Sequence, residues 1–170
     1  MNRLQFATIL SWAGDDGIDG RKRLQKVVFM LQHVGCDLNC KYILHHFGPY
    51  SLDVADVCDQ MVAVNLVEEI PPVGAIGSYK YKLKPPTSQL LASANDDETL
   101  TSFKDKGKQL LAEKLWNLEL GSTVIFFFQR GNDWEESLRK ACGFKKVDPR
   151  DDDSYSAFKF AKSFATAVTI

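Results

Sequence analysis

Apolar residues recur with a helical period in two segments near the start of the chain. In residues 2–13 they gather near one helical face, and in residues 20–34 they follow the i, i+3, i+4, i+7 spacing of an amphipathic helix. Between the two segments, GDDGIDG (14–20) predicts a loop, with Asp19 as a candidate cap for the second helix and Gly35 as its stop. The apolar positions are Leu4, Ala7, Leu10 and Trp12 in the first helix and Leu24, Val27, Val28, Leu31 and Val34 in the second.

A third helix is predicted from Leu52 to about Leu66, after a linker that ends in HHFGPYS (45–51). Residues 42–44 favour a short extended segment. We expect Gly48 and Pro49 to turn the chain, and Ser51 to cap the helix that follows. Phe47 and Tyr50 are expected to anchor this joint by packing.

A β-hairpin is predicted next, because LVEEI (66–70) and YKYKLK (79–84) flank the Pro- and Gly-rich loop PPVGAIGS (71–78). Its alternating pattern places three lysines on one side of the second strand and Tyr79, Tyr81 and Leu83 on the other. The order helix, helix, linker, helix, hairpin is typical of a winged helix, in which the hairpin is the wing.

The second half of the chain is predicted to be helical. A helix over 87–96 precedes a long apolar stripe over 99–131. Asp133 then opens a short helix with a capping-box pattern, and a last helix covers 154–168. The sequence therefore predicts an α+β fold, mainly α. A winged-helix-like core spans 1–85, and a helical extension over 86–170 packs on it as one compact unit.

Composition and charge limit the function classes. The chain is 45% apolar and 25% charged, which is ordinary for a soluble globular protein. Its net charge of −1 gives no global attraction to nucleic acid or membranes. No apolar run reaches the roughly 18 residues needed to span a bilayer, and the N-terminal segment does not resemble a signal peptide. We therefore expect a cytoplasmic protein whose four cysteines are buried thiols.

Residues suited to metal binding occur between positions 33 and 46. Their spacing contains neither a Cys-x-x-Cys nor a His-x-x-x-His pair, so the pattern favours ordinary packing over a zinc site. No other cofactor motif is present, and we expect no cofactor. Adjacent histidines in an extended segment are also expected to point to opposite sides. The candidate ligands are His33, Cys36, Cys40, His45 and His46.

No catalytic residues are predicted. Ser51 or a cysteine near a histidine has the residue types of a nucleophilic dyad, but the chain has no Gly-x-Ser-x-Gly elbow. GDDGIDG matches neither a phosphate loop nor a dinucleotide fingerprint. These observations favour a non-enzymatic protein.

The charge pattern disfavours the usual winged-helix mode of DNA binding. Residues 48–69 contain no Lys or Arg, and Asp53, Asp56 and Asp59 share roughly one face of the third helix. Two basic clusters remain as candidate contacts with nucleic acid or a protein partner. For Arg21, Lys22 and Arg23, an acidic external partner is one explanation, and internal pairing with the aspartates of the third helix or with Asp15–Asp19 is the other. For the lysines of the second cluster, the alternative to a binding contact is a solvated face over a half-buried hairpin. The clusters are Arg21, Lys22, Arg23 and Lys26, and Lys80, Lys82 and Lys84.

A family resemblance is carried by GRKRLQKVVFMLQ (20–32), YILHHFGPYS (42–51) and NLVEE (65–69). These segments, with the tyrosine-bearing YKYKLK, resemble the YwgA-like family of bacterial proteins. LELGSTVIFFFQRG and WEESLRK are similar to the helical C-terminal region of that family. The Leu-Gln-Lys helix and Gly-Pro turn also show a more distant similarity to Panacea-type antitoxin domains. The resemblance implies a winged-helix-like fold with extra helices and no catalytic residues.

These observations predict a non-enzymatic cytoplasmic regulatory or interaction module that binds a protein partner or a second copy of itself. One alternative is a DNA-binding regulator that uses the wing lysines and the basic start of the second helix. Another is an antitoxin-like partner of a toxin.

Overall fold

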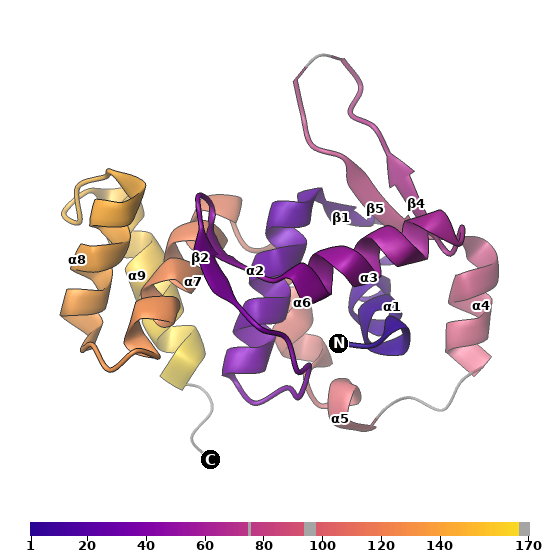
Figure 1. The fold of residues 1–170 in the computed structure, drawn as a ribbon, viewed down its shortest axis with the longest axis horizontal. Helices are drawn as coiled ribbons and strands as arrows, with labels where there is room; N and C mark the ends of the chain where they lie inside the picture. The colour runs from indigo at the N-terminus through magenta and orange to yellow at the C-terminus, as the bar shows by residue number, and fades with distance from the viewer. Residues whose placement is uncertain (75, 94–97, 167–170) are drawn as a thin grey trace.

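Helices form where the apolar residues follow a helical period, and the protein has an α+β fold that is mainly helical (Figure 1). The computed structural model describes residues 1–74, 76–93 and 98–166. The three helices predicted in the first half are confirmed as α1 (Arg3–Ser11), α2 (Gly20–His33) and α3 (Leu52–Ala63). The second half contains α4 (Pro85–Ser93), α5 (Glu98–Thr101), α6 (Lys104–Ala112), α7 (Leu115–Phe128), α8 (Trp134–Lys145) and α9 (Asp152–Thr166).

The predicted hairpin is confirmed and belongs to a three-stranded antiparallel sheet. Strands β4 (Val67–Ile70) and β5 (Lys80–Leu83) pair with each other, and β1 (Ile18–Asp19) adds to the free side of β5. Tyr81 and Leu83 are buried beneath the sheet. The described residues that join β4 to β5, 71–74 and 76–79, project from the body of the molecule (Figure 1).

A second hairpin forms inside the linker and corrects the predicted position of the turn. Strand β2 (Ile43–His45) pairs with β3 (Gly48–Tyr50), and the turn lies at residues 46–47. Gly48 and Pro49 therefore belong to a strand. The β3 strand packs against both α2 and α7, so tertiary contact holds a Gly-Pro sequence in a conformation that its local preferences disfavour.

Of the three helix caps predicted from the sequence, one is confirmed and two are wrong. Asp133 accepts a hydrogen bond from the Glu136 N–H and caps α8 as expected. Ser51 and Asp19 occupy the cap positions of α3 and α2, but neither side chain makes a capping bond. The Ser51 hydroxyl instead lies 3.4 Å from Asp53 Oδ2, and Asp19 forms an ion pair with Lys80. Each group has a competing partner outside the helix backbone.

The long apolar stripe over 99–131 is divided among α5, α6 and α7. Glu113 has an extended backbone with ψ of 153°, which ends α6 and turns the chain into α7. The Arg23 guanidinium donates to the carbonyl oxygens of Leu111 and Glu113 at 3.0 and 2.5 Å. These bonds satisfy backbone groups that a continuous helix would otherwise pair internally.

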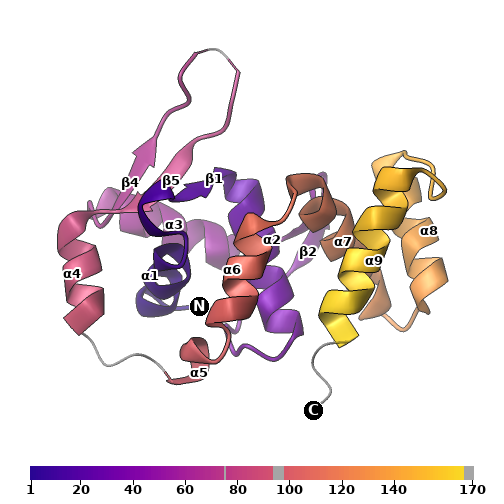
Figure 2. The same cartoon turned by 180° about the vertical axis from the view of Figure 1, so that it is seen from behind.

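Helix α7 lies near the centre of the second half and packs on α2, α8 and α9. Residues 117–126 of this helix are all buried. Gly121 allows close packing on α9, because a Cβ there would lie 3.3 Å from the Ala157 carbonyl oxygen. Figure 1 and Figure 2 place α8 and α9 at one end of the molecule, the sheet with α1, α3 and α4 at the other, and α2 between them. The boundary near residue 85 stays a prediction.

The four cysteines are free and buried, as predicted. Among the described residues, no helix has both the length and the apolar character that crossing a membrane requires.

Gly48 is predicted to tolerate no side chain. Its φ is +96°, and an added Cβ would lie 2.5 Å from Thr123 Oγ1 on α7. Gly131 also has positive φ, at +85°, but a Cβ there would meet open space. We expect Gly48→Ala to lower the free energy of unfolding by about 3 kcal/mol or more, and Gly131→Ala by about 1 kcal/mol. Urea denaturation measures both, and equal losses would contradict the close approach to α7.

Candidate functional site

Polar side chains of α2 bind the α2–α3 connection, residues 34–51. The Gln25 amide donates from Nε2 to the Ser51 carbonyl oxygen and accepts the Ser51 N–H at Oε1, both at 2.9 Å. Gln25 and Ser51 are buried. Without this pair, two backbone groups of Ser51 would be unpartnered away from water, which is costly. The pair holds the residue before α3 against α2.

Gln32 makes the same kind of pair about two turns further along α2. Its Nε2 donates to the Cys40 carbonyl oxygen at 2.9 Å, and its Oε1 accepts the Cys40 N–H at 2.8 Å. Helical residues seven apart lie on nearly the same face. The two glutamines therefore fasten residues 40 and 51 of the connection to one face of α2.

Lys26 binds the connection between these two points. Its side chain is 1% exposed, and Nζ donates to the Pro49 carbonyl oxygen at 2.6 Å. Burial and, to a smaller extent, the nearby Lys145 ammonium lower the pKa of Lys26 to about 7, although Glu119 partly opposes them. Lys26 therefore changes its charge near neutral pH.

The surroundings of Lys26 contain more positive than negative charge. Glu119 lies 3.2 Å from Lys145 and 3.8 Å from Lys22, so one buried carboxylate serves two ammonium groups. Lys22 Nζ also lies 3.5 Å from the centre of the Phe47 ring, a cation–π contact. Phe47 contacts the cationic face of α2 but is 46% exposed, and its role as an anchor of the joint stays a prediction.

Arg21 is fully occupied by internal partners. It forms ion pairs with Asp59 at 2.6 Å and Glu69 at 3.0 Å, and its Nε donates to the Tyr81 hydroxyl at 2.7 Å. The Tyr81 hydroxyl in turn donates to Glu69 at 2.5 Å. Burial, followed by the bond to Glu69, raises the pKa of Tyr81 to about 12, so the phenol stays protonated. This network joins α2, α3 and the hairpin.

The wing lysines also have partners within the chain. Lys80 pairs with Asp19, and Lys82 pairs with Asp15, each at 3.7 Å. Lys84 hydrogen-bonds the Asn65 side chain. With Arg23 bound to backbone carbonyls, every cation of the two predicted clusters has an internal contact. Arg21 pairs with the third helix, as one of the two explanations expects, whereas the loop around Asp15 and Asp19 pairs with the wing lysines.

The candidate metal ligands weighed in the sequence are dispersed in the fold. Among the described residues, no three His, Cys, Asp or Glu side chains are placed to hold an ion. His33 and Cys40 line one cavity. Cys36 is buried in the core, and His45 and His46 are exposed on the β2–β3 hairpin. The predicted opposite orientation of these two histidines is wrong: their ring centroids lie 5.1 Å apart, edge to face, because His46 lies in the turn.

The wing loop presents apolar residues to solvent. Val73 and Ile76 have relative exposures of 103% and 94%, which makes them the most exposed large apolar side chains in the described part of the chain. Residues 71–79 include no charged residue. The tip of the wing is therefore apolar and lies beyond the lysines of β5.

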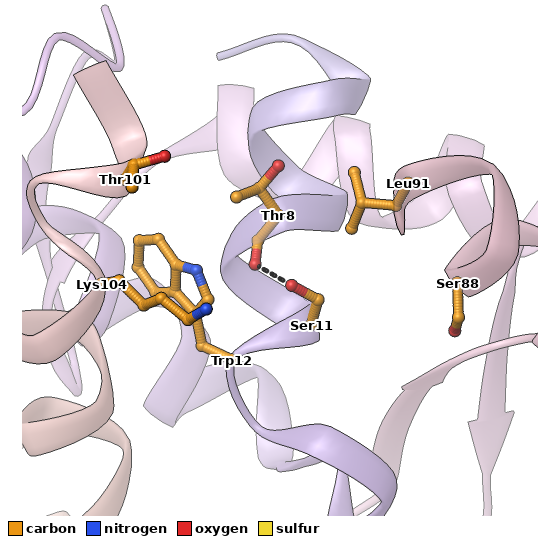
Figure 3. Close-up of a pocket in the computed structure, with 7 residues that line it drawn as sticks. All are labelled: Thr8, Ser11, Trp12, Ser88, Leu91, Thr101 and Lys104. Carbon is orange, nitrogen blue, oxygen red and sulfur yellow. Dashed lines mark hydrogen bonds between the residues drawn. The ribbon is translucent and has the colours of Figure 1, made fainter. Parts of the chain in front are cut away.

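A cavity of about 170 Å³ lies beside α1 (Figure 3). It is lined by Thr8 and Ser11 from α1 and by Trp12, which directly follows this helix, and its other lining residues come from α4, α5 and α6. Figure 3 shows the Ser11 hydroxyl bonded to the Thr8 carbonyl oxygen, at 2.6 Å. The described lining residues include no histidine, cysteine or carboxylate, so this cavity offers no acid–base pair.

Gln25 and Gln32 are not among the residues that the sequence predicts to be important, although they fasten the α2–α3 connection to α2. Their signal in the sequence is two glutamines seven positions apart on an amphipathic helix, which is followed by a linker with a predicted extended segment. Such residues are candidates for binding backbone outside the helix, because a buried amide requires a partner.

Comparison with known proteins gives one informative similarity. No protein-family model matches this chain. Over 153 residues the chain is 26% identical to the uncharacterized protein YwgA of Bacillus subtilis (strain 168), covering 89% of this chain and 90% of that protein. This similarity over most of both chains supports the YwgA-like resemblance. The similarity to Panacea-type antitoxin domains stays an expectation.

Gln25 is predicted to be more important for stability than an exposed glutamine. Gln25→Leu leaves the Ser51 N–H and carbonyl buried without partners, so we expect a loss of about 2–4 kcal/mol in the free energy of unfolding. Gln89→Leu, the same change at an exposed position of α4, is the matched control and should change stability by less than about 0.5 kcal/mol. Chemical denaturation of both variants measures the difference, and equal effects would contradict the role of the pair.

Lys26 is predicted to make stability depend on pH. Its pKa is lowered on folding, so the folded protein releases this proton near pH 7 while the unfolded chain keeps it until about pH 10.5. Stability therefore rises with pH above 7, by at most about 1.4 kcal/mol per pH unit. Lys26→Met removes this dependence, so its stability relative to wild type should fall between about pH 6 and pH 9.

The exposed Lys108→Met variant is the control for this experiment. Its stability relative to wild type should not change with pH. Denaturation curves for the three proteins across this range measure the effect, and parallel profiles for Lys26→Met and wild type would contradict a lowered pKa.

Proposed function

We propose that the protein is a non-enzymatic regulatory or interaction module of winged-helix type that binds a protein partner through its wing. The element order supports the fold: α1, β1, α2 and α3 precede the β4–β5 hairpin, and β1 completes the antiparallel sheet. The apolar wing tip carries the functional part of the proposal.

The chemistry of the wing tip favours a protein surface over nucleic acid. Val73 and Ile76 extend an uncharged apolar loop into solvent. Burial of such side chains against an apolar surface releases about 25 cal/mol per Å² of apolar area, whereas phosphate contacts require cations. The wing therefore suits a partner with an apolar depression.

The distribution of charge gives independent support. The third helix, α3, carries three aspartates, and one of them pairs with Arg21. A DNA-binding surface that used Arg21 and Arg23 would have to use cations that already hold the fold together. The buried thiol of Cys40 also favours a non-enzymatic role, because burial raises its pKa and disfavours the nucleophilic thiolate.

DNA binding is the second candidate, favoured by the wing lysines. The ion pairs of Lys80 and Lys82 are long, at 3.7 Å, and their aspartates are exposed. Exposed pairs of this kind contribute little, so these lysines can exchange their partners for phosphates at small cost.

The wing-tip proposal predicts loss of partner binding when the tip becomes acidic. A tagged Val73→Asp/Ile76→Asp variant should recover its partner at least about tenfold less efficiently than wild type. Tyr155→Asp, which makes the same kind of change at the start of α9, should retain the partner. Co-purification from cells of the source organism followed by measurement with the purified pair tests this, and equal recovery by both variants would contradict the proposal.

The two candidates are separated by binding to mixed duplex DNA at about 50 and 200 mM salt. The protein-partner proposal expects no salt-sensitive binding. Binding that is strong at low salt, falls steeply at high salt and is weakened by Lys80→Gln/Lys82→Gln would replace it with the DNA-binding function.

A further inference from the structure

A second cavity lies where the C-terminal ends of α2 and α7 meet the α2–α3 connection. Its volume is about 190 Å³, enough for several water molecules or a small organic ligand. It lies apart from the wing and from the charged network around Arg21. The lining residues are Phe29, Gln32 and His33 from α2, Cys40 and Tyr42 from the connection, Phe126 from α7, and Gln129 and Arg130, which directly follow α7.

Tyr42 brings an unpartnered hydroxyl to this cavity. Its Oη is buried, and together with the Trp116 indole N–H it is one of two such side-chain atoms without a hydrogen-bond partner in the described part of the chain. Burial raises the pKa of Tyr42 well above its usual value, so the phenol keeps its proton and can donate it in a hydrogen bond. A buried donor without an acceptor costs about 1–3 kcal/mol, and a bound acceptor would recover this cost.

Arg130 brings positive charge to the same cavity. Its guanidinium carbon lies 3.3 Å from the centre of the Phe126 ring, and Nη1 donates to the Phe126 carbonyl oxygen at 2.9 Å. In the described part of the chain Arg130 has no carboxylate partner, and no acceptor meets Nε or Nη2. Nε and Nη2 form one edge of the guanidinium, which suits two oxygens of a carboxylate or phosphate.

The remaining polar groups are held in place by bonds within the protein. The amide of Gln32 is occupied by the Cys40 backbone, and the Cys40 thiol lies 3.5 Å from the Leu38 carbonyl oxygen. Gln129 Nε2 lies 2.8 Å from His33 Nδ1. Burial lowers the pKa of His33 and favours the neutral ring, which carries its proton on Nε2 when Gln129 donates to Nδ1. His33 is then a further donor.

We propose that this cavity binds a small oxyanion, the carboxylate or phosphate group of a metabolite-sized ligand, with Arg130 and the Tyr42 hydroxyl as its main donors. Both groups line one small space, one supplies charge and the other lacks any partner of its own. The aromatic rings of Phe29 and Phe126 hold these donors, because Phe29 packs edge to face on Tyr42 at 4.9 Å and Phe126 stacks under Arg130. These ring contacts position both donors beside the cavity.

The first test measures thermal unfolding of the full chain in Tris chloride buffer with added sodium acetate or inorganic phosphate, against sodium chloride at equal ionic strength. Wild type should gain stability with one or both oxyanions. Tyr42→Phe removes only the unpartnered hydroxyl, so it should be at least as stable as wild type in chloride and should gain less from the oxyanion. Arg130→Gln should gain nothing, while Arg139→Gln, an exposed arginine paired with Glu136 on α8, should respond like wild type.

The second test follows the Arg130 Nε–H signal and the Tyr42 amide by NMR during the same titrations. We expect saturable shifts with a Kd in the millimolar range or tighter, weakened at least about tenfold by Tyr42→Phe and by Arg130→Gln. Acetate and phosphate separate the two ligand classes. Dispersed spectra of the variants establish that they are folded.

Two results would overturn the proposal. One is the absence of saturable shifts with either oxyanion up to about 100 mM, well above a millimolar Kd. The other is a Tyr42→Phe variant that loses the same stability in every buffer, because that pattern means that an ordered water already satisfies the hydroxyl.

Discussion

Hydrogen bonds from α2 side chains to the backbone of the α2–α3 connection are the constraint on which the rest of the structure depends. Gln25, Lys26 and Gln32 bind Ser51, Pro49 and Cys40. These contacts place the β2–β3 hairpin between α2 and α7 and fix the start of α3. Buried backbone that lies outside regular structure requires such partners. The buried polar residues on α2 therefore supply hydrogen-bond partners to a connection that is enclosed by the fold.

The cations of the chain serve the fold first. Arg21 joins α2 to α3 and the hairpin, and Arg23 ends α6 by binding its last carbonyls. Lys22 shares Glu119 with Lys145. Because these three cations have partners nearby, the surface around the start of α2 presents little unpaired charge. The most distinctive exposed feature of the described part of the molecule is then the apolar wing tip. This contrast between paired cations and an exposed apolar loop is the physical basis for preferring a protein partner.

The α2–α3 connection contributes both to the packing of α2 and to the proposed oxyanion cavity. The Gln32 pair that fastens Cys40 to α2 also positions Tyr42, two residues further on, at the edge of the cavity. Arg130 comes from the end of α7, which the β3 strand contacts at Gly48. A ligand that bound Tyr42 and Arg130 would therefore add a second link between residues 34–51 and the end of α7, besides the contact at Gly48. Binding there would stabilise the arrangement that the glutamine pairs establish.

The sequence by itself determined the α+β class, the helices α1 to α3, the β4–β5 hairpin and the burial of the cysteines. These features follow from apolar periodicity and turn residues, which act over a few neighbouring positions. Only the tertiary structure decided the β2–β3 hairpin, the division of the long helical stripe, the partners of the cations and the cavity beside Tyr42. Their determinants join residues far apart in the chain, such as Gln25 with Ser51 and Arg23 with Leu111, separated by 26 and 88 positions. A pattern read along the chain contains no information on which distant groups meet, because that depends on how the helices pack.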